Sequence, residues 1–530
     1  MASVSERGRV YLIGAGPGDP GLITVKGRRC LEEADVVIYD YLANPRLLSY
    51  AHPEARRVYV GKKSDKHTVE QESINALLIE EAKRGNIVAR LKGGDAFIFG
   101  RGGEEALALA EAGIDFEIVP GVTSAYAVPA YAGIPVTHRG LAADVSFITG
   151  RQRHADEGPE IAWDLLGKGG GTLVFLMGVT SLPEIVEKLT AHGRAAETPA
   201  AIIRWGTTGD QECVTGSLAD IVERTREGGL RPPGVIVVGE VVALREKLAW
   251  FEKKPLFGRR VVITRAAGQA GALSEALTAA GADVIDFPTL EIRPVDDYTV
   301  FDRAMAALQA DPDVFDWTIL ASANAVRFMV KRLHHLELDV RALGSSELAA
   351  VGAATAAALA IENLRADLVP KDFRAEGLVS ELGRIGIGGK NILIPRAQEG
   401  REILPESLRK LGARVTVAPL YRNVPAETPL GPLLEALATD EVDYVTFTSG
   451  STVKNFLGRL AEGGLESDGS AGGGPLGLAK TAVIGPVAAK TAARLGLPVD
   501  VMPDEATIPA LVEAIIADAG KETLRGDAKR

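Results

Sequence analysis

Short, continuously apolar segments alternate with Ala-, Leu- and Glu-rich segments along nearly all of the 530 residues. Examples of the apolar segments are RVYLIGAG, ADVVIYD, NIVARLKGGD, TLVFLMGV, GVIVVGEVV, RRVVITR and KNILIPR. Strands that are apolar along their whole length are typical of parallel sheets with helices on both faces. The alternation with helical segments therefore predicts an α/β fold with largely parallel sheets.

The chain length is enough for roughly three to four domains. A charged segment ends at Pro255, and a new strand is expected to begin at Arg260. We therefore expect two halves joined by a short linker, with a frayed tail after them. The predicted units are residues 1–245, the linker 246–257, residues 258–520 and the tail 521–530.

Composition excludes several classes of protein. The net charge is −11, from 59 basic and 70 acidic side chains, whereas a general nucleic-acid binder has a basic face. No apolar segment approaches the roughly 18 residues of a membrane span, and the first residues have no signal-peptide core. We therefore expect a cytoplasmic protein without membrane or nucleic-acid partners. Two cysteines and seven histidines without ligand spacing predict no metal site.

The loop GAGPGDPG begins like the G-x-G-x-x-G fingerprint of dinucleotide-binding proteins but departs from it. Asp19 occupies the place of the third glycine, where its carboxylate would repel a pyrophosphate. Pro17 and Pro20 lack the backbone N–H groups that a phosphate site uses. The loop suits a ligand without phosphates, above all a positively charged one. The alternative is a tight strand-to-helix turn without a ligand.

Two further segments favour a ligand site. Asp95 lies in a glycine-bounded loop directly after a predicted strand, and VPGVTSAYAVPAYAGIPVTHRG is rich in small residues that permit close backbone approach to a ligand. Loops of this kind after parallel strands meet in a crevice at the carboxyl edge of the sheet.

The motifs GAGPGDPGLITVKG, ADVVIYDYL, VGKK, LKGGDAFIFGRGGEE and AGIPVTHRG resemble those of the tetrapyrrole methylases, in particular uroporphyrinogen-III C-methyltransferase. They extend in order over about residues 8–245. The resemblance implies S-adenosylmethionine as methyl donor, S-adenosylhomocysteine as its product, and a homodimer formed through this half. It also implies a two-domain α/β fold unlike the Rossmann methyltransferases, with subdomains at about 8–122 and 123–245.

The resemblance also assigns residues to roles. The donor would be bound by Pro17, Gly93, Gly94, Asp95, Ile98, Thr123, Ser124, Met177 and Gly206. Asp40 and Lys62 match the family's proposed proton acceptor and donor; the alternatives are a helix N-cap and a surface lysine. Arg101, His138 and Arg139 are expected to bind substrate carboxylates. Two positions depart from the family pattern, since Ala96 replaces a usual proline and Ser124 a common alanine.

An internal repeat organises the second half. GRRVVITRAAGQAGALSEALTAAGADVIDFPTLEI resembles GKNILIPRAQEGREILPESLRKLGARVTVAPLYRN, with Arg265 equivalent to Arg396. FDWTILASANAV likewise matches VDYVTFTSGSTV, which places Ser322 opposite Ser449. Two copies of one α/β unit predict two similar lobes with a cleft between them, a common place for a ligand.

The motifs VVITR, FPTLEI, SANAV, YVTFTSGSTV, AVIGPVAAKTA and LPVDVMPDEAT resemble uroporphyrinogen-III synthase. The resemblance implies a two-lobed α/β fold joined by a two-stranded ribbon, for which FPTLEIRP and APLYRNVP are the candidates. One lobe would comprise about 258–288 and 424–520, and the other about 291–420.

The implied reaction is closure of hydroxymethylbilane to uroporphyrinogen III with inversion of ring D. Candidate substrate-binding residues are Arg265, Ser322, Asn324, Thr355, Arg396, Ser449 and Ser451. Tyr421 matches a tyrosine proposed to assist loss of the hydroxyl; the alternative is aromatic packing at the ribbon. For the serines the alternative is helix N-capping. Ala488 stands where the family usually has a threonine.

The two halves together predict a bifunctional enzyme. The second half would make uroporphyrinogen III, and the first would methylate it at C-2 and C-7 to give precorrin-2. One alternative is a methylase acting on another corrin precursor. A second is that the C-terminal half binds a tetrapyrrole without catalysing a reaction.

Overall fold

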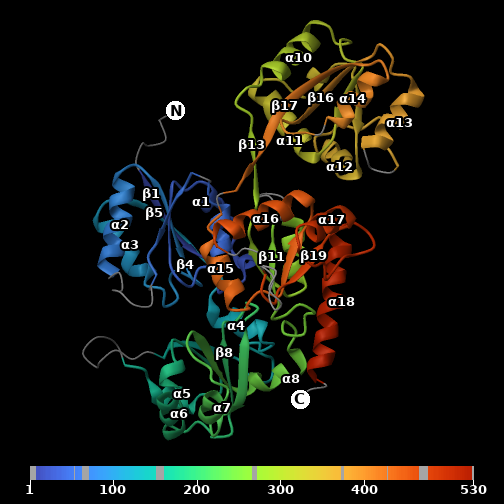
Figure 1. The fold of residues 1–530 in the computed structure, drawn as a ribbon. Helices are drawn as coiled ribbons and strands as arrows, with labels where there is room; N and C mark the ends of the chain where they lie inside the picture. Colours follow the sequence, from blue (N-terminus) through green and yellow to red (C-terminus); the bar gives the residue numbers. More distant parts are fainter. Residues whose placement is uncertain are drawn as a thin grey trace.

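The computed structural model describes residues 8–52, 54–61, 71–150, 160–265, 271–371, 375–400, 402–426, 428–464 and 476–527. Strands and helices alternate through four sheets, two in each half of the chain (Figure 1). This confirms the predicted α/β class. No helix in the described ranges is both long and apolar enough to cross a membrane.

The first sheet is parallel throughout and has the strand order β3-β2-β4-β1-β5. Its strands are β1 (Arg9–Gly14), β2 (Val36–Tyr39), β3 (Arg56–Tyr59), β4 (Ile87–Lys92) and β5 (Asp115–Val119). Its helices are η1 (Pro20–Leu22), α1 (Val25–Glu32), η2 (Pro45–Tyr50), α2 (Gln71–Lys83) and α3 (Gly102–Glu111). Because all strands run the same way, the loops after β1, β2, β4 and β5 meet at one edge of the sheet.

The second sheet, in the order β6-β7-β10-β8-β9, is mostly antiparallel. Its strands are β6 (Val145–Thr149), β7 (Thr172–Leu176), β8 (Pro199–Arg204), β9 (Glu212–Ser217) and β10 (Gly234–Val238). Its helices are α4 (Ser124–Tyr131), α5 (Trp163–Lys168), η3 (Val179–Ser181), α6 (Leu182–Ala191), α7 (Ile221–Glu227) and η4 (Glu240–Leu244). The expectation of largely parallel pairing was wrong for this sheet. An apolar strand sequence indicates that both faces of the strand are buried, but it does not indicate whether the neighbouring strands run parallel or antiparallel to it.

The segment between the halves is folded and packed. It begins with α8 (Arg245–Leu248), after which Phe251 packs edge-on against Tyr131 of α4, with ring centroids 4.8 Å apart. Leu256 is fully buried in the core of the following lobe. The segment is therefore anchored on the first half and in the second.

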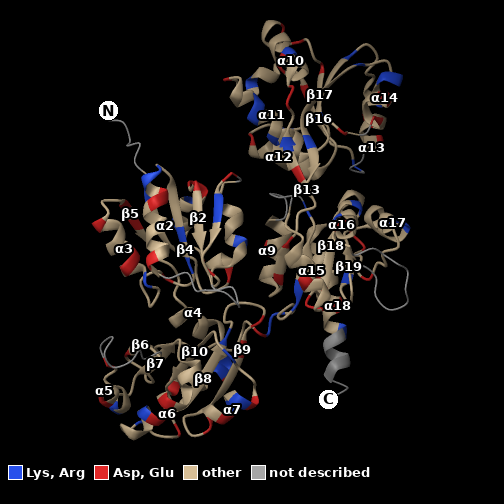
Figure 2. Ribbon diagram, turned by 60° about the vertical axis from the view of Figure 1, so that its left-hand side comes forward, with Lys and Arg blue, Asp and Glu red and all other residues tan. Residues whose placement is uncertain are grey.

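The third sheet, β12-β11-β18-β19, is parallel and is built from two separate stretches of the chain. Its strands are β11 (Arg260–Ile263), β12 (Asp283–Asp286), β18 (Tyr444–Phe447) and β19 (Lys480–Val483). Its helices are α9 (Gly271–Ala279), α15 (Gly431–Ala438), α16 (Gly450–Glu462), α17 (Pro486–Arg494) and α18 (Ile508–Asp527). This lobe lies beside the first half of the chain in both ribbon views (Figures 1 and 2).

The fourth sheet, β13-β17-β16-β14-β15, forms the lobe at the top of Figure 1. Its strands are β13 (Leu290–Pro294), β14 (Trp317–Leu320), β15 (Glu347–Ala350), β16 (Asn391–Ala397) and β17 (Arg414–Pro425). Its helices are α10 (Thr299–Ala310), α11 (Ala323–His335), η5 (Val340–Leu343), α12 (Ala353–Ile361), α13 (Ala375–Ile385) and α14 (Ile403–Lys410). β13 pairs antiparallel with the end of β17, which confirms the predicted two-stranded ribbon.

Candidate active sites

Three loops of the first sheet pack backbone to backbone at its carboxyl edge. Gly16 and Gly94 exchange backbone hydrogen bonds of 3.1 and 2.7 Å, which joins the loop after β1 to the loop after β4. A Cβ added to Gly14 would clash with Gly121, and one added to Gly121 would clash with the carbonyl of Gly94. The glycines are therefore needed for close approach of these chain segments to one another; the predicted close approach of the backbone to a ligand stays a prediction.

Both carboxylate oxygens of Asp95 organise this edge. Oδ1 accepts the N–H groups of Phe97 (2.8 Å) and Ile98 (3.1 Å), and Oδ2 accepts the N–H of Gly121 (2.8 Å). Thr123 caps the start of α4 by accepting the N–H of Ala125 (3.3 Å). Asp95 thus fixes the loop after β4 against the loop after β5.

The second subdomain contributes residues with unusual backbone conformations. Met177 has φ +57° and an exposed side chain, and it directly follows β7. Trp205 and Thr207 also have positive φ in the turn after β8, on either side of Gly206. A Cβ on Gly206 would clash with Val128 of α4, so this turn lies tightly against the helix.

One large cavity, with a volume of about 2600 Å³, collects the predicted donor-site residues. Its lining includes Pro17, Gly93, Gly94, Asp95, Ile98, Thr123, Ser124, Met177 and Gly206. Asp40 and Arg101 line it as well. His138 and Arg139 do not, because they lie in an exposed turn that His138 closes with Ala142. Lys62 lies outside the described residues.

Asp40 is attached to a buried network of charges. Its Oδ2 accepts a hydrogen bond from Arg90 Nη2 (3.3 Å), and its Oδ1 accepts the N–H of Leu42 (3.1 Å). Arg90 Nε and Lys92 Nζ, both on β4, donate to Glu105 Oε1 of α3 at 3.3 and 2.8 Å. The Glu105 side chain is 0% exposed. Burial lowers the pKa of Lys92, and Glu105 opposes that shift.

This network was not predicted from the sequence, although a signal exists. Arg90 and Lys92 interrupt the apolar strand IVARLKGG, and basic side chains inside such a strand need buried acidic partners. The partner, Glu105, lies in a different element. Sequence alone does not select it from the other acidic residues nearby.

The second half holds its candidate residues in separate groups. Tyr421 Oη and Ser322 Oγ share a hydrogen bond of 2.8 Å, and the Tyr421 ring stacks on Phe328. Burial raises the pKa of Tyr421. The hydroxyls of Ser449 and Ser451 lie 2.9 Å apart at the start of α16 in the other lobe.

Ser322 and Ser449 both cap helices, as the alternative interpretation predicted. Ser322 accepts the N–H of Ala325 and Ser449 that of Thr452. Asn324 is half-buried in the first turn of α11, and Thr355 is buried in α12. Arg396 pairs with Glu402. None of these side chains lines the large cavity.

Arg265, at the end of β11, does line the large cavity. Burial lowers the pKa of its guanidinium. Within the described part of the chain it has neither a hydrogen-bond nor an ion-pair partner. The Arg265 side chain is therefore available to an anion.

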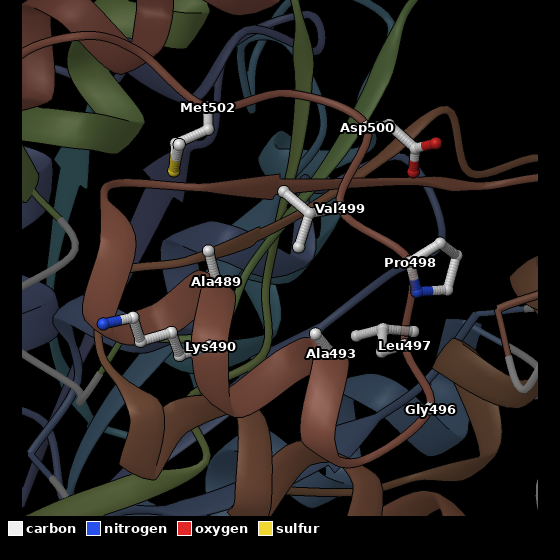
Figure 3. Close-up of a pocket in the computed structure, with 9 residues that line it drawn as sticks. All are labelled: Ala489, Lys490, Ala493, Gly496, Leu497, Pro498, Val499, Asp500 and Met502. Carbon is white, nitrogen blue, oxygen red and sulfur yellow. The ribbon is translucent and has the colours of Figure 1, made fainter.

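Figure 3 shows a second, smaller pocket, of about 860 Å³, between α17 and residues 496–502. Its lining is mainly apolar, with Lys490 and Asp500 on opposite sides. No predicted site residue lines it.

The described ranges also contain no group of three or more His, Cys, Asp or Glu side chains placed to hold a metal.

Comparison with known proteins gives matches in both halves. The family model of the tetrapyrrole (corrin/porphyrin) methylases matches residues 9–222, and that of uroporphyrinogen-III synthase HemD matches residues 271–513. Porphyrin biosynthesis protein HemD of Ruminiclostridium josui is 37% identical over 87% of this chain and 91% of its own length. Uroporphyrinogen-III C-methyltransferase of Priestia megaterium is 53% identical over 44% of this chain and 98% of its own.

A crystal structure of uroporphyrin-III C-methyl transferase from Thermus thermophilus, complexed with S-adenyl homocysteine, is also similar. It is 41% identical and has a TM-score of 0.38, covering 45% of this chain and 100% of that chain. The relative from Ruminiclostridium josui matches most of the present chain, and the two family models match its two halves in turn. The chain therefore belongs to the tetrapyrrole methylases in its first half and to the uroporphyrinogen-III synthases in its second, joined in one polypeptide.

Proposed function

We propose that the chain is a bifunctional enzyme of tetrapyrrole biosynthesis. The second half closes hydroxymethylbilane to uroporphyrinogen III with inversion of ring D. The first half transfers two methyl groups from S-adenosylmethionine to C-2 and C-7, giving precorrin-2. The observation that carries the methylase assignment is the convergence of the donor-site residues and Asp40 on one cavity.

The residues at this cavity fit S-adenosylmethionine. Gly94 has φ +69° and leaves room where a side chain would stand, so a ligand can approach the backbone. The exposed side chains of Ile98 and Met177 offer apolar surface to an adenine ring. No cluster of basic side chains is needed, because this donor has no phosphate. When bound, it supplies a methyl group on a positively charged sulfur.

The chain's own residues orient the acceptor and move its proton. Asp40 faces the cavity with its Oδ2 fixed by Arg90, so it is positioned to accept a proton from a methylated pyrrole carbon. Arg101 lines the same cavity and can bind a substrate carboxylate. Lys62 remains the predicted proton donor. Alignment of the acceptor carbon supplies much of the remaining acceleration.

In the synthase half, Tyr421 is proposed to assist departure of the substrate hydroxyl. A phenol is protonated at neutral pH, and burial raises the pKa of Tyr421 further, so its hydroxyl can donate a hydrogen bond to the leaving oxygen. Substrate carboxylates would be bound by Arg265 and by the N-terminal N–H groups of α11 and α16. The latter helices begin at Ser322 and Ser449, so capping and anion binding can coexist at these ends.

We further propose a cytoplasmic homodimer formed through the methylase half. Phe97, Phe99, Leu107 and Tyr126 are exposed apolar side chains on that half, and a contacting copy would cover such surface. Basic and acidic residues are interspersed over both halves (Figure 2), which supports a small-molecule substrate and not a nucleic acid.

One assay tests both activities. The purified chain should convert hydroxymethylbilane to isomer III without added synthase, and added S-adenosylmethionine should convert that product to the dimethylated macrocycle. Formation of isomer I only, at the uncatalysed rate, would contradict the synthase assignment. That result would favour the alternative that the C-terminal half binds tetrapyrroles without catalysing a reaction. The presence of Ala488 where the family usually has a threonine also favours this alternative. Methylation of another corrin precursor but not of uroporphyrinogen III would contradict the methylase assignment.

A further inference from the structure

The large cavity is lined by both halves of the chain. Asp40, Asp95 and Met177 contribute from the first half, and Arg265 and Arg293 contribute from the second. Its volume of about 2600 Å³ exceeds the roughly 300–1,000 Å³ of a pocket for one drug-sized ligand. The proposed methylation residues and one residue assigned to the synthase reaction, Arg265, therefore open into one shared space.

Two polar contacts hold the halves together at this space. Arg46 of η2 pairs with Asp286 at the end of β12, with Nε and Oδ2 3.2 Å apart, and it also contacts Ser274 of α9. Arg260 at the start of β11 pairs with Asp210 of the turn after β8 at 3.1 Å. The Arg46 and Arg260 side chains are 24% and 19% exposed, and their partners Asp286 and Asp210 are 35% and 62% exposed, so solvent screens both pairs in part.

The linker adds an apolar contact. The ring centroids of Trp250 and Tyr131 lie 5.1 Å apart, and Phe251 packs on both Tyr131 and Phe257. Trp250 Nε1 also donates to the carbonyl of Ala130 (3.0 Å). A linker that is anchored in this way keeps the two halves at one separation, whereas a flexible linker would allow a wide range of separations.

Arg265 supplies an anion-binding group on the synthase side of the space. Its half-buried guanidinium has no partner among the described residues, and arginine binds carboxylates through paired hydrogen bonds. Uroporphyrinogen III carries acetate and propionate groups around its ring. A product leaving the synthase lobe would meet this arginine at the wall of the cavity in which methylation is proposed.

We propose that this shared cavity passes uroporphyrinogen III from the synthase half to the methylase half without release into bulk solvent. The inference rests on the function proposed above. A retained product is methylated at an effective concentration in the millimolar range or higher, as for other short connections. The free pool of uroporphyrinogen III then contributes little to the product.

An isotope-dilution experiment on the full chain tests this proposal. The enzyme receives isotope-labelled hydroxymethylbilane and S-adenosylmethionine together with unlabelled uroporphyrinogen III. With the unlabelled pool in about tenfold excess, complete release before methylation lowers the label in precorrin-2 about tenfold. Passage through the cavity instead keeps the label close to that of the hydroxymethylbilane. Full dilution overturns the proposal.

Each half-reaction is also measured with its own substrate. If either one is missing, the proposed function fails, and the passage proposal fails with it. If both run and the label is fully diluted, only the passage proposal fails. The two failures are therefore distinguishable.

Variants at the contact between the halves give the matched comparison. Arg46→Asp places a second carboxylate opposite Asp286, and we expect the label in the product to be diluted. Adding Asp286→Arg to that variant should restore part of the retention. Arg226→Asp, on exposed α7 outside the cavity, is the control and should retain the label. Unchanged retention in Arg46→Asp, or equal loss in the control, would overturn the role assigned to this contact.

Discussion

Glu105→Gln is expected to destabilise the first half of the chain by about 3–5 kcal/mol at neutral pH, the usual cost of breaking a buried ion pair. Glu105 Oε1 lies 2.8 Å from Lys92 Nζ and 3.3 Å from Arg90 Nε. At an effective dielectric constant of about 20, each attraction amounts to roughly 5–6 kcal/mol before the cost of desolvation. Glutamine keeps the shape but loses both attractions. Arg90 retains Asp40, so most of the cost falls on Lys92.

The loss should depend on pH in a defined direction. Burial already lowers the pKa of Lys92 below its usual value of 10.5, and removing Glu105 lowers that pKa further. Below the pKa in the folded chain, Lys92 is protonated both folded and unfolded, so the cost is fully present. Between that pKa and 10.5, only the unfolded chain keeps the proton, so folding stability rises with pH. The stability difference between Glu105→Gln and the parent should therefore shrink from pH 7 to pH 10.

Three of the four tryptophans, Trp163, Trp205 and Trp250, lie before the second half and Trp317 lies within it, so urea unfolding followed by tryptophan fluorescence reports mainly on the first half. Adding Lys92→Met to Glu105→Gln removes both charges and should recover most of the stability. Glu111→Gln, on the exposed end of α3, should change little. A loss below about 1 kcal/mol in Glu105→Gln, or a double variant less stable than the single one, would refute the charge argument.

Three other substitutions test the proposed sites. Asp40→Asn should lower methylation by about 10²–10⁴-fold, as for loss of a general base, while S-adenosylhomocysteine still binds in calorimetry; full turnover would remove the proton-acceptor role. Tyr421→Phe should slow formation of isomer III and leave Ser322 without its partner, whereas an unchanged rate would reduce Tyr421 to a packing residue. Tyr131→Phe removes the hydrogen bond to Asp19 and should weaken S-adenosylhomocysteine binding by up to about tenfold; unchanged affinity would show that Asp19 does not need this support.

Much of the methylase cavity could be predicted because it is built from strand ends. Residues in the loops that follow β1, β2 and β4, such as Pro17, Asp40 and Gly93, must meet at the carboxyl edge of a parallel sheet. The direction of β8–β10 could not be predicted, since strands buried on both faces have the same apolar pattern in either direction. The contact of Arg46 with Asp286 could not be predicted either, because it joins elements of the two halves that share no sequence motif.

The acidic residues of the glycine loops are hydrogen-bonded to protein groups, which the sequence pattern did not predict. The loop sequence predicts that Asp19 suits a positively charged ligand. In the structure its oxygens accept the N–H of Gly21 and the hydroxyl of Tyr131, each at 2.7 Å. Both oxygens of Asp95 likewise accept hydrogen bonds from backbone N–H groups, in its own loop and in the loop after β5. Both carboxylates therefore shape the loops, and the proposed donor site would use backbone groups and apolar side chains for its contacts. Asp40 also has both oxygens hydrogen-bonded, to Leu42 and Arg90, so its proposed role in proton transfer rests on its place at the cavity and on the family resemblance, not on a free oxygen.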